Sequence, residues 1–367
     1  MKVAKTKWKQ NIMSDCIKTV KVKDAVQKKD YQRYGQYPII SQEKDFISGY
    51  CDSIENLNSI GEVVIFGDHT RVLKFVDFDF CVGADGVKVI RPNSDINTKY
   101  LFHFLKWVDI PSNGYSRHFK FLKELNISYP SLSIQQAITS ELDAIQTIID
   151  GYKAQLEDLD ALAQSIFLDM FGAPVSNPKG WEKGSLNKYA SIGTGATPSR
   201  KIVSYYEGDI PWVKSTEVHN SYIWETQEHI TKEAIDNSNC SIYLPDTILV
   251  AMYGQGKTRG QVGLLRIKAA TNQACAAIQC KDSLNPTFCY WHFQMCYEAN
   301  RELGNGTNQK NMNLTIVGNI KFIIPPLSLQ QEFAFKIESI EKQKELICKQ
   351  LEDAKTMMAE RMQYYFS

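Results

Sequence analysis

The chain has 367 residues, of which 43% are hydrophobic and 23% are charged, and its formal net charge is +1. This length is enough for two or three globular domains. No signal peptide and no apolar run of membrane-spanning length is present, which excludes an integral membrane protein and leads us to expect a cytoplasmic location.

Nine cysteines are scattered along the chain. They form no CxxC pair, and no histidine stands at zinc-ligand spacing from them. We therefore expect reduced thiols that act mostly as small core residues, with no metal site and no cofactor in this chain.

The small net charge conceals an uneven distribution. Residues 1–125 and 172–328 carry more Lys and Arg than Asp and Glu, whereas residues 134–171 are strongly acidic. This pattern suits a polyanion that contacts the basic segments, although the excess is too small to identify that partner.

The first 130 residues are predicted to form a globular α/β unit. Strands are indicated by β-branched and aromatic residues at 37–42, 61–67, 72–80 and 87–90. Residues 99–108 are predicted to be a short helix. A polar turn at 113–118 and a short helical segment that ends at residue 125 close the unit.

Residues 131–172 have the pattern of a long coiled-coil helix. Ser133 and Gln136 would form a capping box, and Gly172 followed by a proline would end the helix. Apolar residues recur at alternating steps of three and four, which is the period of a coiled-coil seam. This seam is Leu142, Ile145, Ile149, Tyr152, Leu156, Leu159, Ala163, Ile166 and Met170.

After a polar linker at 173–179, residues 180–326 are predicted to form a second globular unit. It opens on a tryptophan, as the first unit does, and 211–213 and 247–252 are predicted strands. Residues 286–300 are predicted to be one helix. A polar turn at 305–310 takes the place of the turn at 113–118.

The last segment, 327–367, repeats the first long helix. Pro130-Ser-Leu-Ser-Ile-Gln-Gln136 returns as Pro325-Pro-Leu-Ser-Leu-Gln-Gln331, and Gln155-Leu-Glu-Asp158 returns as Gln350-Leu-Glu-Asp353, at the same spacing and without an insertion. A repeated capping box is expected at Ser328 and Gln331. The second seam is Ile337, Ile340, Lys344, Ile347, Leu351, Ala354, Met358 and Arg361. Lys344 and Arg361 either fix its register or reach past it.

The helix repeat predicts that the two long helices pair with each other. A helix of roughly 38 residues is about 57 Å long at 1.5 Å per residue, and a chain of this size has no core that could bury it alone. The fold class is therefore α/β (α+β), with two globular units and two paired long helices.

Six segments resemble the DNA specificity subunits of bacterial type I restriction-modification systems. They are Phe66-Gly-Asp-His-Thr-Arg71, Val82-Gly-Ala-Asp85, Gly254-Gln-Gly-Lys-Thr-Arg-Gly260, Thr271-Asn-Gln-Ala-Cys275, Gly306-Thr-Asn-Gln-Lys310 and the helix start at Pro325. The resemblance covers essentially the whole chain.

This resemblance implies two target recognition domains, each reading half of a split DNA sequence in the major groove. It also implies that the long helices are antiparallel, set the gap between the half-sites and dock two methyltransferase subunits. The chain itself would not be an enzyme and would need no membrane. Its partners would use S-adenosylmethionine to methylate adenine, and added motor-nuclease subunits would use ATP and Mg to cut unmethylated DNA.

Polar loop residues are the candidates for DNA contact, because Arg, Lys, His and amide side chains suit phosphates and base edges. Each of these loops could instead be a purely structural turn. Trp212 and Trp224 are expected in the core. The DNA-contact candidates are His69, Thr70, Arg71, Lys74, Arg117, His118, Ser199, Arg200, Lys201, Gln255, Lys257, Thr258, Arg259, Asn308, Gln309 and Lys310.

Catalytic alternatives lack their motifs. A phosphate loop ending at Gly256-Lys-Thr258 requires a glycine at position 251, where alanine stands. Asp68, His69 and Arg71 have no recognisable nucleophile beside them. The chain lacks an Asn-Pro-Pro-Tyr motif and paired nuclease carboxylates with a lysine. A protein-protein adaptor that uses the paired helices as its docking surface stays open, and the salt dependence of DNA binding separates it from a DNA-reading scaffold.

Overall fold

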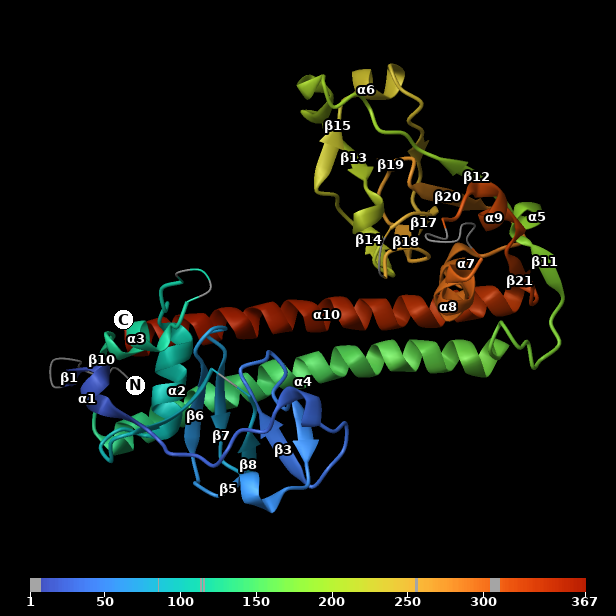
Figure 1. The fold of residues 1–367 in the computed structure, drawn as a ribbon. Helices are drawn as coiled ribbons and strands as arrows, with labels where there is room; N and C mark the ends of the chain where they lie inside the picture. The colour runs from blue at the N-terminus through green and yellow to red at the C-terminus, as the bar shows by residue number, and fades with distance from the viewer. Residues whose placement is uncertain (1–7, 85, 113, 115, 255–256, 304–310) are drawn as a thin grey trace. The chain divides into compact units, whose positions relative to one another are not determined.

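The computed structural model describes residues 8–84, 86–112, 114, 116–254, 257–303 and 311–367 (Figure 1). The chain divides into two compact units. Unit 1 consists of the residues up to Ala154 together with Cys348–Ser367, and unit 2 consists of Gln155–Ile347. The two long helices, α4 (Leu132–Phe171) and α10 (Leu327–Phe366), therefore contribute to both units.

Unit 1 contains two four-stranded sheets, with the orders β2-β9-β6-β7 and β4-β3-β8-β5, and a two-stranded ribbon β1-β10. The strands are β1 (Lys9–Ile12), β2 (Ile17–Thr19), β3 (Tyr37–Ile40), β4 (Gly49–Cys51), β5 (Leu57–Asn58), β6 (Val63–Gly67), β7 (Leu73–Val76), β8 (Phe80–Val82), β9 (Val87–Pro92) and β10 (Asn126–Tyr129). The short helices are α1 (Met13–Cys16), η2 (Lys28–Asp30), η3 (Ile54–Asn56), α2 (Thr98–Trp107) and α3 (Phe119–Lys123).

Unit 2 contains sheets of order β12-β20-β17-β18-β14 and β15-β13-β19-β16, and the ribbon β11-β21. The strands are β11 (Lys183–Ser185), β12 (Ala190–Thr194), β13 (Ile210–Val213), β14 (Ser221–Ile223), β15 (Glu228–Ile230), β16 (Ile242–Tyr243), β17 (Ile248–Ala251), β18 (Val262–Leu265), β19 (Ala269–Thr271), β20 (Cys275–Cys280) and β21 (Lys321–Ile323). The helices are α5 (Leu186–Tyr189), η4 (Val203–Tyr206), η5 (Ser215–Glu217), α6 (Lys232–Asp236), α7 (Pro286–Met295), α8 (Tyr297–Arg301) and α9 (Leu314–Asn319).

The two units share one topology, apart from the extra strand β14. In each, a central strand, β6 or β17, is flanked by antiparallel neighbours, and the second sheet contains one parallel pair, β3 with β8 or β13 with β19. The sequence-based strands at 37–42, 61–67, 87–90, 211–213 and 247–252 each overlap one strand of this pattern. The predicted strand at 72–80 instead spans β7 and the start of β8, which belong to different sheets. The predicted helix 286–300 is instead two helices, which are separated at Cys296.

Alternate residues of the central strands face opposite sides of the sheet and pack into two different hydrophobic clusters, one with the helices and one with the second sheet. Val64 and Phe66 of β6 pack with the helices, whereas Val63 and Ile65 pack against the second sheet. The central strand of unit 2 repeats this division, since Val250 faces the helices and Leu249 and Ala251 face the second sheet. Both strands are buried on both faces, which explains their unbroken apolar sequence.

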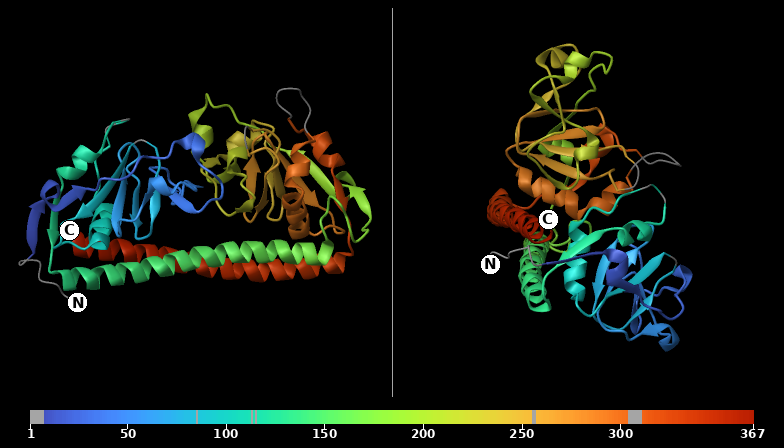
Figure 2. Two further views of the ribbon diagram at one scale, coloured as in Figure 1. Left: turned by 60° about the horizontal axis from the view of Figure 1, so that its bottom comes forward. Right: turned by 90° about the vertical axis from the view of Figure 1, so that its left-hand side faces the viewer.

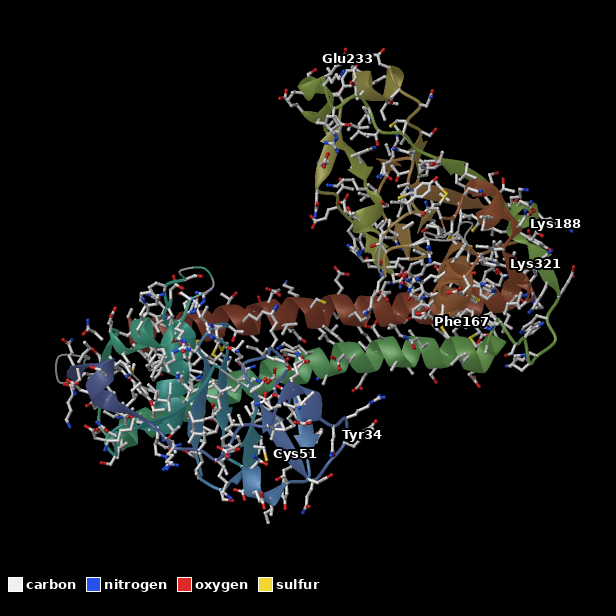
Figure 3. All side chains as sticks on the ribbon, viewed as in Figure 1. Tyr34, Cys51, Phe167, Lys188, Glu233 and Lys321 are labelled. Carbon is white, nitrogen blue, oxygen red and sulfur yellow. The ribbon has the colours of Figure 1, made fainter. Side chains whose placement is uncertain are left out.

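Within each unit, α4 and α10 lie side by side and antiparallel (Figures 1 and 2). In unit 2, Phe167 near the end of α4 packs edge-to-face on Phe333 near the start of α10, with ring centroids 5.4 Å apart (Phe167 is labelled in Figure 3). In unit 1, Arg361 near the end of α10 pairs with Glu141 near the start of α4 at 2.8 Å. The predicted pairing of the long helices therefore holds in both units.

The buried face of the helix pair is wider than a coiled-coil seam, because a third helix packs on it in each unit. In unit 1, the ring of Phe366 lies 5.3 Å from Tyr100 of α2. In unit 2, the ring of Phe171 lies 4.8 Å from Phe288 of α7. Phe366 and Phe171 lie outside the predicted seams and are buried. The predicted seam residues that are buried are Leu142, Ile145, Ile149, Ala163, Ile337, Ile340, Leu351 and Ala354, whereas Tyr152, Leu156, Leu159, Ile166, Met170, Ile347 and Met358 are half-buried.

The two basic seam positions reach past the seam to form ion pairs between the helices. Lys344 is half-buried and its ammonium lies 2.7 Å from Asp160 of α4. Arg361 is exposed and pairs with Glu141, as described above. Each pair joins α4 to α10 within one unit.

The starts of the long helices differ from the predicted capping boxes. The helices begin at Leu132 and Leu327, so Ser133 and Ser328 lie in the first turn and are not N-caps. The amides of the third and fourth helical residues donate to the backbone carbonyls of Ser131 in α4 and Pro326 in α10. Within the described part of the chain, no helix combines the length and apolar character that crossing a membrane would need.

His292 of α7 is a buried group whose ionisation opposes folding. Its ring stacks on Phe322 with centroids 3.8 Å apart, and its Nε2 accepts the N–H of Ile323 at 3.3 Å. Burial lowers the pKa of His292 to about 3. Because the unfolded side chain titrates near pH 6.5, protonation favours the unfolded chain, and stability is lost as the pH falls below that value.

We predict that the His292→Phe variant loses part of this acid sensitivity. Between pH 7.5 and 5.5, the wild-type chain should lose about 1.4 kcal/mol of unfolding free energy through this one group. The variant should lose correspondingly less in denaturant titrations at the two pH values. His219→Phe, at an exposed histidine, is the control and should keep the wild-type slope. An unchanged slope in His292→Phe would contradict the prediction.

Candidate nucleic-acid interface

In unit 1, two predicted site segments that are distant in sequence meet at Asp68. The carbonyl of Asp68 accepts the backbone N–H of His118 at 2.8 Å, and its Oδ1 accepts the N–H of Phe119 at 2.8 Å. The carboxylate thus satisfies a free amide at the start of α3. This contact holds the turn 68–71 against the helix that follows residues 117–118.

A set of cations surrounds this junction. The ammonium of Lys88 lies 4.0 Å from Asp68 Oδ2, and those of Lys88 and Lys123 lie 5.9 and 5.0 Å from the ring centre of Phe119. Lys120 lies on the same short helix, and the exposed Arg117 precedes it. We call Lys88, Arg117, Lys120 and Lys123 the α3 basic patch. Of these four residues, only Arg117 was predicted from the sequence to contact DNA. The three lysines do not lie in a recognisable loop motif. The signal that could have found Lys120 and Lys123 is their spacing of three residues directly after Arg117 and His118.

The turn 68–71 is held from both sides. The hydroxyl of Thr70 donates to the carbonyl of Gln42 at 2.7 Å, and the backbone N–H of His69 donates to Oε1 of Gln42 at 3.3 Å. Arg71 has a left-handed backbone with φ of 60°, and its guanidinium donates to the carbonyl of Ile110 at 2.7 Å. These bonds give His69 and Arg71 defined positions.

A shallow groove of about 410 Å³ lies between this turn and the end of α2. It combines cationic, acidic and apolar side chains. The residues that line it are Thr70, Arg71, Leu73, Leu105, Lys106, Val108, Asp109 and Ile110.

Two predicted contacts of unit 1 are buried. The ammonium of Lys74 donates to the carbonyls of Asp45 and Phe46 at 2.5 and 3.2 Å, and burial lowers its pKa. His118 is 1% exposed, and its Nδ1 lies 3.0 Å from the carbonyl of Asp68. Both side chains bond to backbone carbonyls inside unit 1 and are not available to DNA, so they are not part of the candidate interface.

In unit 2, Arg200 lies over two aromatic rings. Its guanidinium carbon lies 4.0 Å from the ring centre of Tyr206 and 5.2 Å from that of Trp212. Glu228 accepts from Arg200 at 2.6 Å and from Lys214 at 2.8 Å, and these two cations lower the pKa of its carboxyl. The neighbouring Ser199 and Lys201 are exposed.

The two tryptophans near this site differ. Trp212 is buried, and its indole N–H donates to the carbonyl of Ala196 at 3.1 Å. Trp224 is 65% exposed, so the expectation that it lies in the core is wrong. It follows strand β14, which is the edge strand of the five-stranded sheet.

Residues 257–260, the described end of the glycine-rich segment, contact α8. The guanidinium of Arg259 donates to the carbonyl of Arg301 at 3.3 Å, and the hydroxyl of Tyr297 donates to the carbonyl of Lys257. Gly260 has φ of 84°, which favours glycine. The side chain of Lys257 is exposed and that of Thr258 is half-buried. The predicted contacts Gln255, Asn308, Gln309 and Lys310 lie outside the described residues.

The motif segments occupy equivalent places in the two units. After β6, the N–H of Asp68 donates to the carbonyl of Gly86 at 2.7 Å; after β17, the N–H of Met252 donates to that of Ala274 at 2.8 Å. In both cases the acceptor lies in the connection that passes from one sheet to the other. Among the described residues, no group of three His, Cys, Asp or Glu side chains is placed to hold a metal ion.

Comparison with known families matches both halves of the chain. The family model described as type I restriction modification DNA specificity domain matches residues 7–159 and 178–355. The chain is 24% identical to the specificity subunit of the type I restriction enzyme EcoR124I/EcoR124II of Escherichia coli, over 69% of this chain and 66% of that subunit. It is 23% identical to the MjaIX specificity subunit of Methanocaldococcus jannaschii, over 73% and 69%.

Solved structures share the fold. The S subunit of a type I restriction-modification system from M. genitalium matches with a TM-score of 0.67 at 14% identity, over 100% of this chain and 98% of that one. A chain from a structure that describes complex assembly and conformational transition of the type I R-M system matches with a TM-score of 0.54 at 13% identity, over 97% and 96%. At these identities the likeness concerns the fold alone.

We predict that Asp68→Ala loosens α3. Loss of a carboxylate that accepts a helix-start amide costs about 1 to 2 kcal/mol. Hydrogen exchange of the amides of Phe119–Lys123 should therefore accelerate by about 5- to 30-fold. Asp24→Ala, at an exposed aspartate, should leave these rates unchanged. Equal exchange in Asp68→Ala and wild type would show that Asp68 does not hold the helix.

Proposed function

Because this chain belongs to the type I restriction modification DNA specificity family, we propose that it is a DNA-recognition subunit in which each unit reads one half of a split target. The observation that carries this proposal is the repeated placement of basic loops at the same sheet junction in both units. Two copies of one scaffold with different loop residues suit two different half-sites.

The α3 basic patch is the proposed phosphate-contacting surface of unit 1. Lys120 and Lys123 stand about one helical turn apart on α3, and Lys88 reaches the ring of Phe119 from strand β9, beside the ordered turn that carries His69 and Arg71. In unit 2, Arg200, Lys201 and Lys257 take this role. Lysine and arginine contacts to phosphate position a protein on DNA, whereas donors from ordered turns read base edges.

The catalytic steps belong to partner subunits in this proposal. Specificity subunits are the non-catalytic part of type I complexes. We infer that two methyltransferase subunits dock on this chain and bind S-adenosylmethionine for adenine methylation. Two motor-nuclease subunits with ATP and Mg complete a restriction complex where they are present.

The long helices are the proposed spacer. Each is an unbroken helix of 40 residues, about 60 Å long at 1.5 Å per residue, and each contributes to both units. Helices that pair antiparallel within each unit resist bending better than a flexible linker. We infer that their length sets the gap between half-sites.

Charge neutralisation tests the DNA surface. Replacing Lys88, Lys120 and Lys123 together by glutamine should weaken binding to duplex DNA. It should also reduce the slope of log affinity against log salt by about 2 to 3, since each phosphate contact contributes about 0.9. Gel-shift titrations at several salt concentrations measure both quantities.

The matched control replaces the exposed lysines Lys18, Lys21 and Lys29 of the same unit. This variant has the same net charge and should keep the wild-type slope. Equal slopes in both triple variants would remove the α3 basic patch from the interface. A wild-type chain that bound DNA without salt dependence would favour the protein-protein adaptor instead.

Shortening both helices tests the spacer. We predict that deletion of residues 150–156 and 348–354 shortens the preferred gap by roughly 3 base pairs, because seven helical residues span about 10.5 Å and one base pair about 3.4 Å. Both deletions lie between the two interhelical ion pairs, which are therefore kept. Sequencing of duplexes retained from a random library gives the gap and both half-sites. Changed half-sites, or an unchanged gap in a binding variant, would refute the spacer role.

A further inference from the structure

Two buried glutamines occupy matched positions in the repeated helix starts. Gln135 is the fourth residue of α4 and Gln330 is the fourth residue of α10, and both are 0% exposed. Buried amides of this size are uncommon and need partners for both their N–H and C=O groups. The neighbouring Gln136 and Gln331 are exposed.

Gln135 is fully engaged with the backbone of unit 1. Its Nε2 donates to the carbonyls of Pro130 and Asp95 at 2.8 and 2.9 Å. Its Oε1 accepts the backbone N–H of Asn97 at 2.7 Å. One side chain thus joins three points of the main chain.

Gln330 makes the equivalent contacts in unit 2. Its Nε2 donates to the carbonyl of Pro325 at 2.8 Å, and its Oε1 accepts the backbone N–H of Asn285 at 2.9 Å. Pro130 and Pro325 occupy the same place in the repeat. The same amide geometry therefore occurs twice in one chain.

The backbone groups that bond to Gln135 and Gln330 belong to the two structures that the glutamines connect, the globular part of each unit and the start of its long helix. Asn97 and Asn285 are the N-caps of α2 and α7, the helices that cover the central sheet of each unit. Pro130 and Pro325 lie where the last strand of each unit, β10 or β21, leads into its long helix. Each glutamine therefore fastens a globular unit to the start of a long helix, and we call this contact the amide joint.

The contacts of α2 and of α7 with α4 differ between the units. In unit 1, Lys99 of α2 forms an ion pair with Asp143 of α4 at 2.8 Å, and Nε2 of His103 is hydrogen-bonded to the same carboxylate at 2.9 Å. In unit 2, α7 meets α4 through the aromatic contact of Phe288 with Phe171. Both units share two contacts of this third helix. One is the amide joint, and the other is the ring of a phenylalanine at the end of a long helix, Phe366 on Tyr100 in unit 1 and Phe171 on Phe288 in unit 2.

A hydrogen-bonded amide fixes direction as well as distance. Hydrogen bonds weaken steeply when the angle departs from linear, whereas apolar contacts tolerate sliding and rotation. A buried amide that bonds to both the long helix start and the N-cap of α2 or α7 therefore selects one angle between them. Replacing it by an apolar side chain leaves two or three buried backbone groups without their partner.

We propose that Gln135 and Gln330 are positioning residues that fix the angle at which each recognition unit is held on its long helix. This inference rests on the proposed function, in which the separation of two half-sites is measured. Neither glutamine touches DNA in this scheme. Both act through the orientation of the loops that do.

The experiment compares discrimination between gap lengths in the full chain. Duplexes carry the selected half-sites with the preferred gap or with one base pair more or less. Gln135→Met and Gln330→Met keep the side-chain length but lose the hydrogen bonds. Each should reduce the ratio of affinities between the preferred and altered gaps by about tenfold, equivalent to about 1.4 kcal/mol, while the half-sites stay the same.

Gln331→Met is the matched control, one residue along α10 from Gln330 and exposed. It should discriminate between gaps as the wild type does. Gln136 is not a control, because its Oε1 accepts a hydrogen bond from the side chain of Asn97 at 3.4 Å. Gln135→Glu is a second test variant, because a protonated carboxyl can donate to one carbonyl and accept from Asn97, whereas a carboxylate cannot donate. Gap discrimination by this variant should therefore improve as the pH is lowered. The Gln135→Glu variant keeps the test available if Gln135→Met does not fold.

The outcomes separate the two claims. Methionine variants that fold, bind and discriminate gaps as the wild type does would overturn the positioning role, even if their melting temperature fell. Altered half-sites would overturn it too. A wild-type chain that bound no duplex would overturn the proposed function, and the positioning role with it.

Discussion

The apolar face of the long helices is the constraint on which the architecture depends. A 40-residue helix cannot bury such a face alone, and in each unit α4 and α10 cover each other. A third helix completes the contact, with Phe366 against α2 in unit 1 and Phe171 against α7 in unit 2. Within each unit, the paired helix segments are thereby part of the hydrophobic core.

Duplication explains why the helices and the loops differ in how closely they repeat. Each long helix packs against the other long helix and against α2 or α7, and it also carries an amide joint. These contacts restrict which residues its sequence can contain. The loops at the sheet junctions make fewer such contacts, so their sequences can vary more. Asp68 and Met252 make the same backbone hydrogen bond in the two units, yet the side chains around them differ. One scaffold can therefore present two different sets of polar groups.

The candidate site was only partly predictable, because exposure depends on neighbours that are distant in sequence. Lys74 looked like an ordinary loop cation, but the carbonyls of Asp45 and Phe46 enclose its ammonium. Lys88 lacked a motif and gained a place beside Asp68 only through the pairing of β9 with β6. Trp224 looked like a core residue and is exposed, because β14 is an edge strand.

The sequence by itself determined the two globular units, their central strands and the pairing of two repeated helices. Apolar periodicity and an ungapped repeat can both be read directly from the order of the residues. The tertiary structure alone decided where the helices begin and which faces they bury. It also decided which polar side chains are available. Gln135 and Gln136 are adjacent and chemically identical, but only the tertiary structure buries the first among the main-chain groups of Asp95, Asn97 and Pro130 and leaves the second exposed.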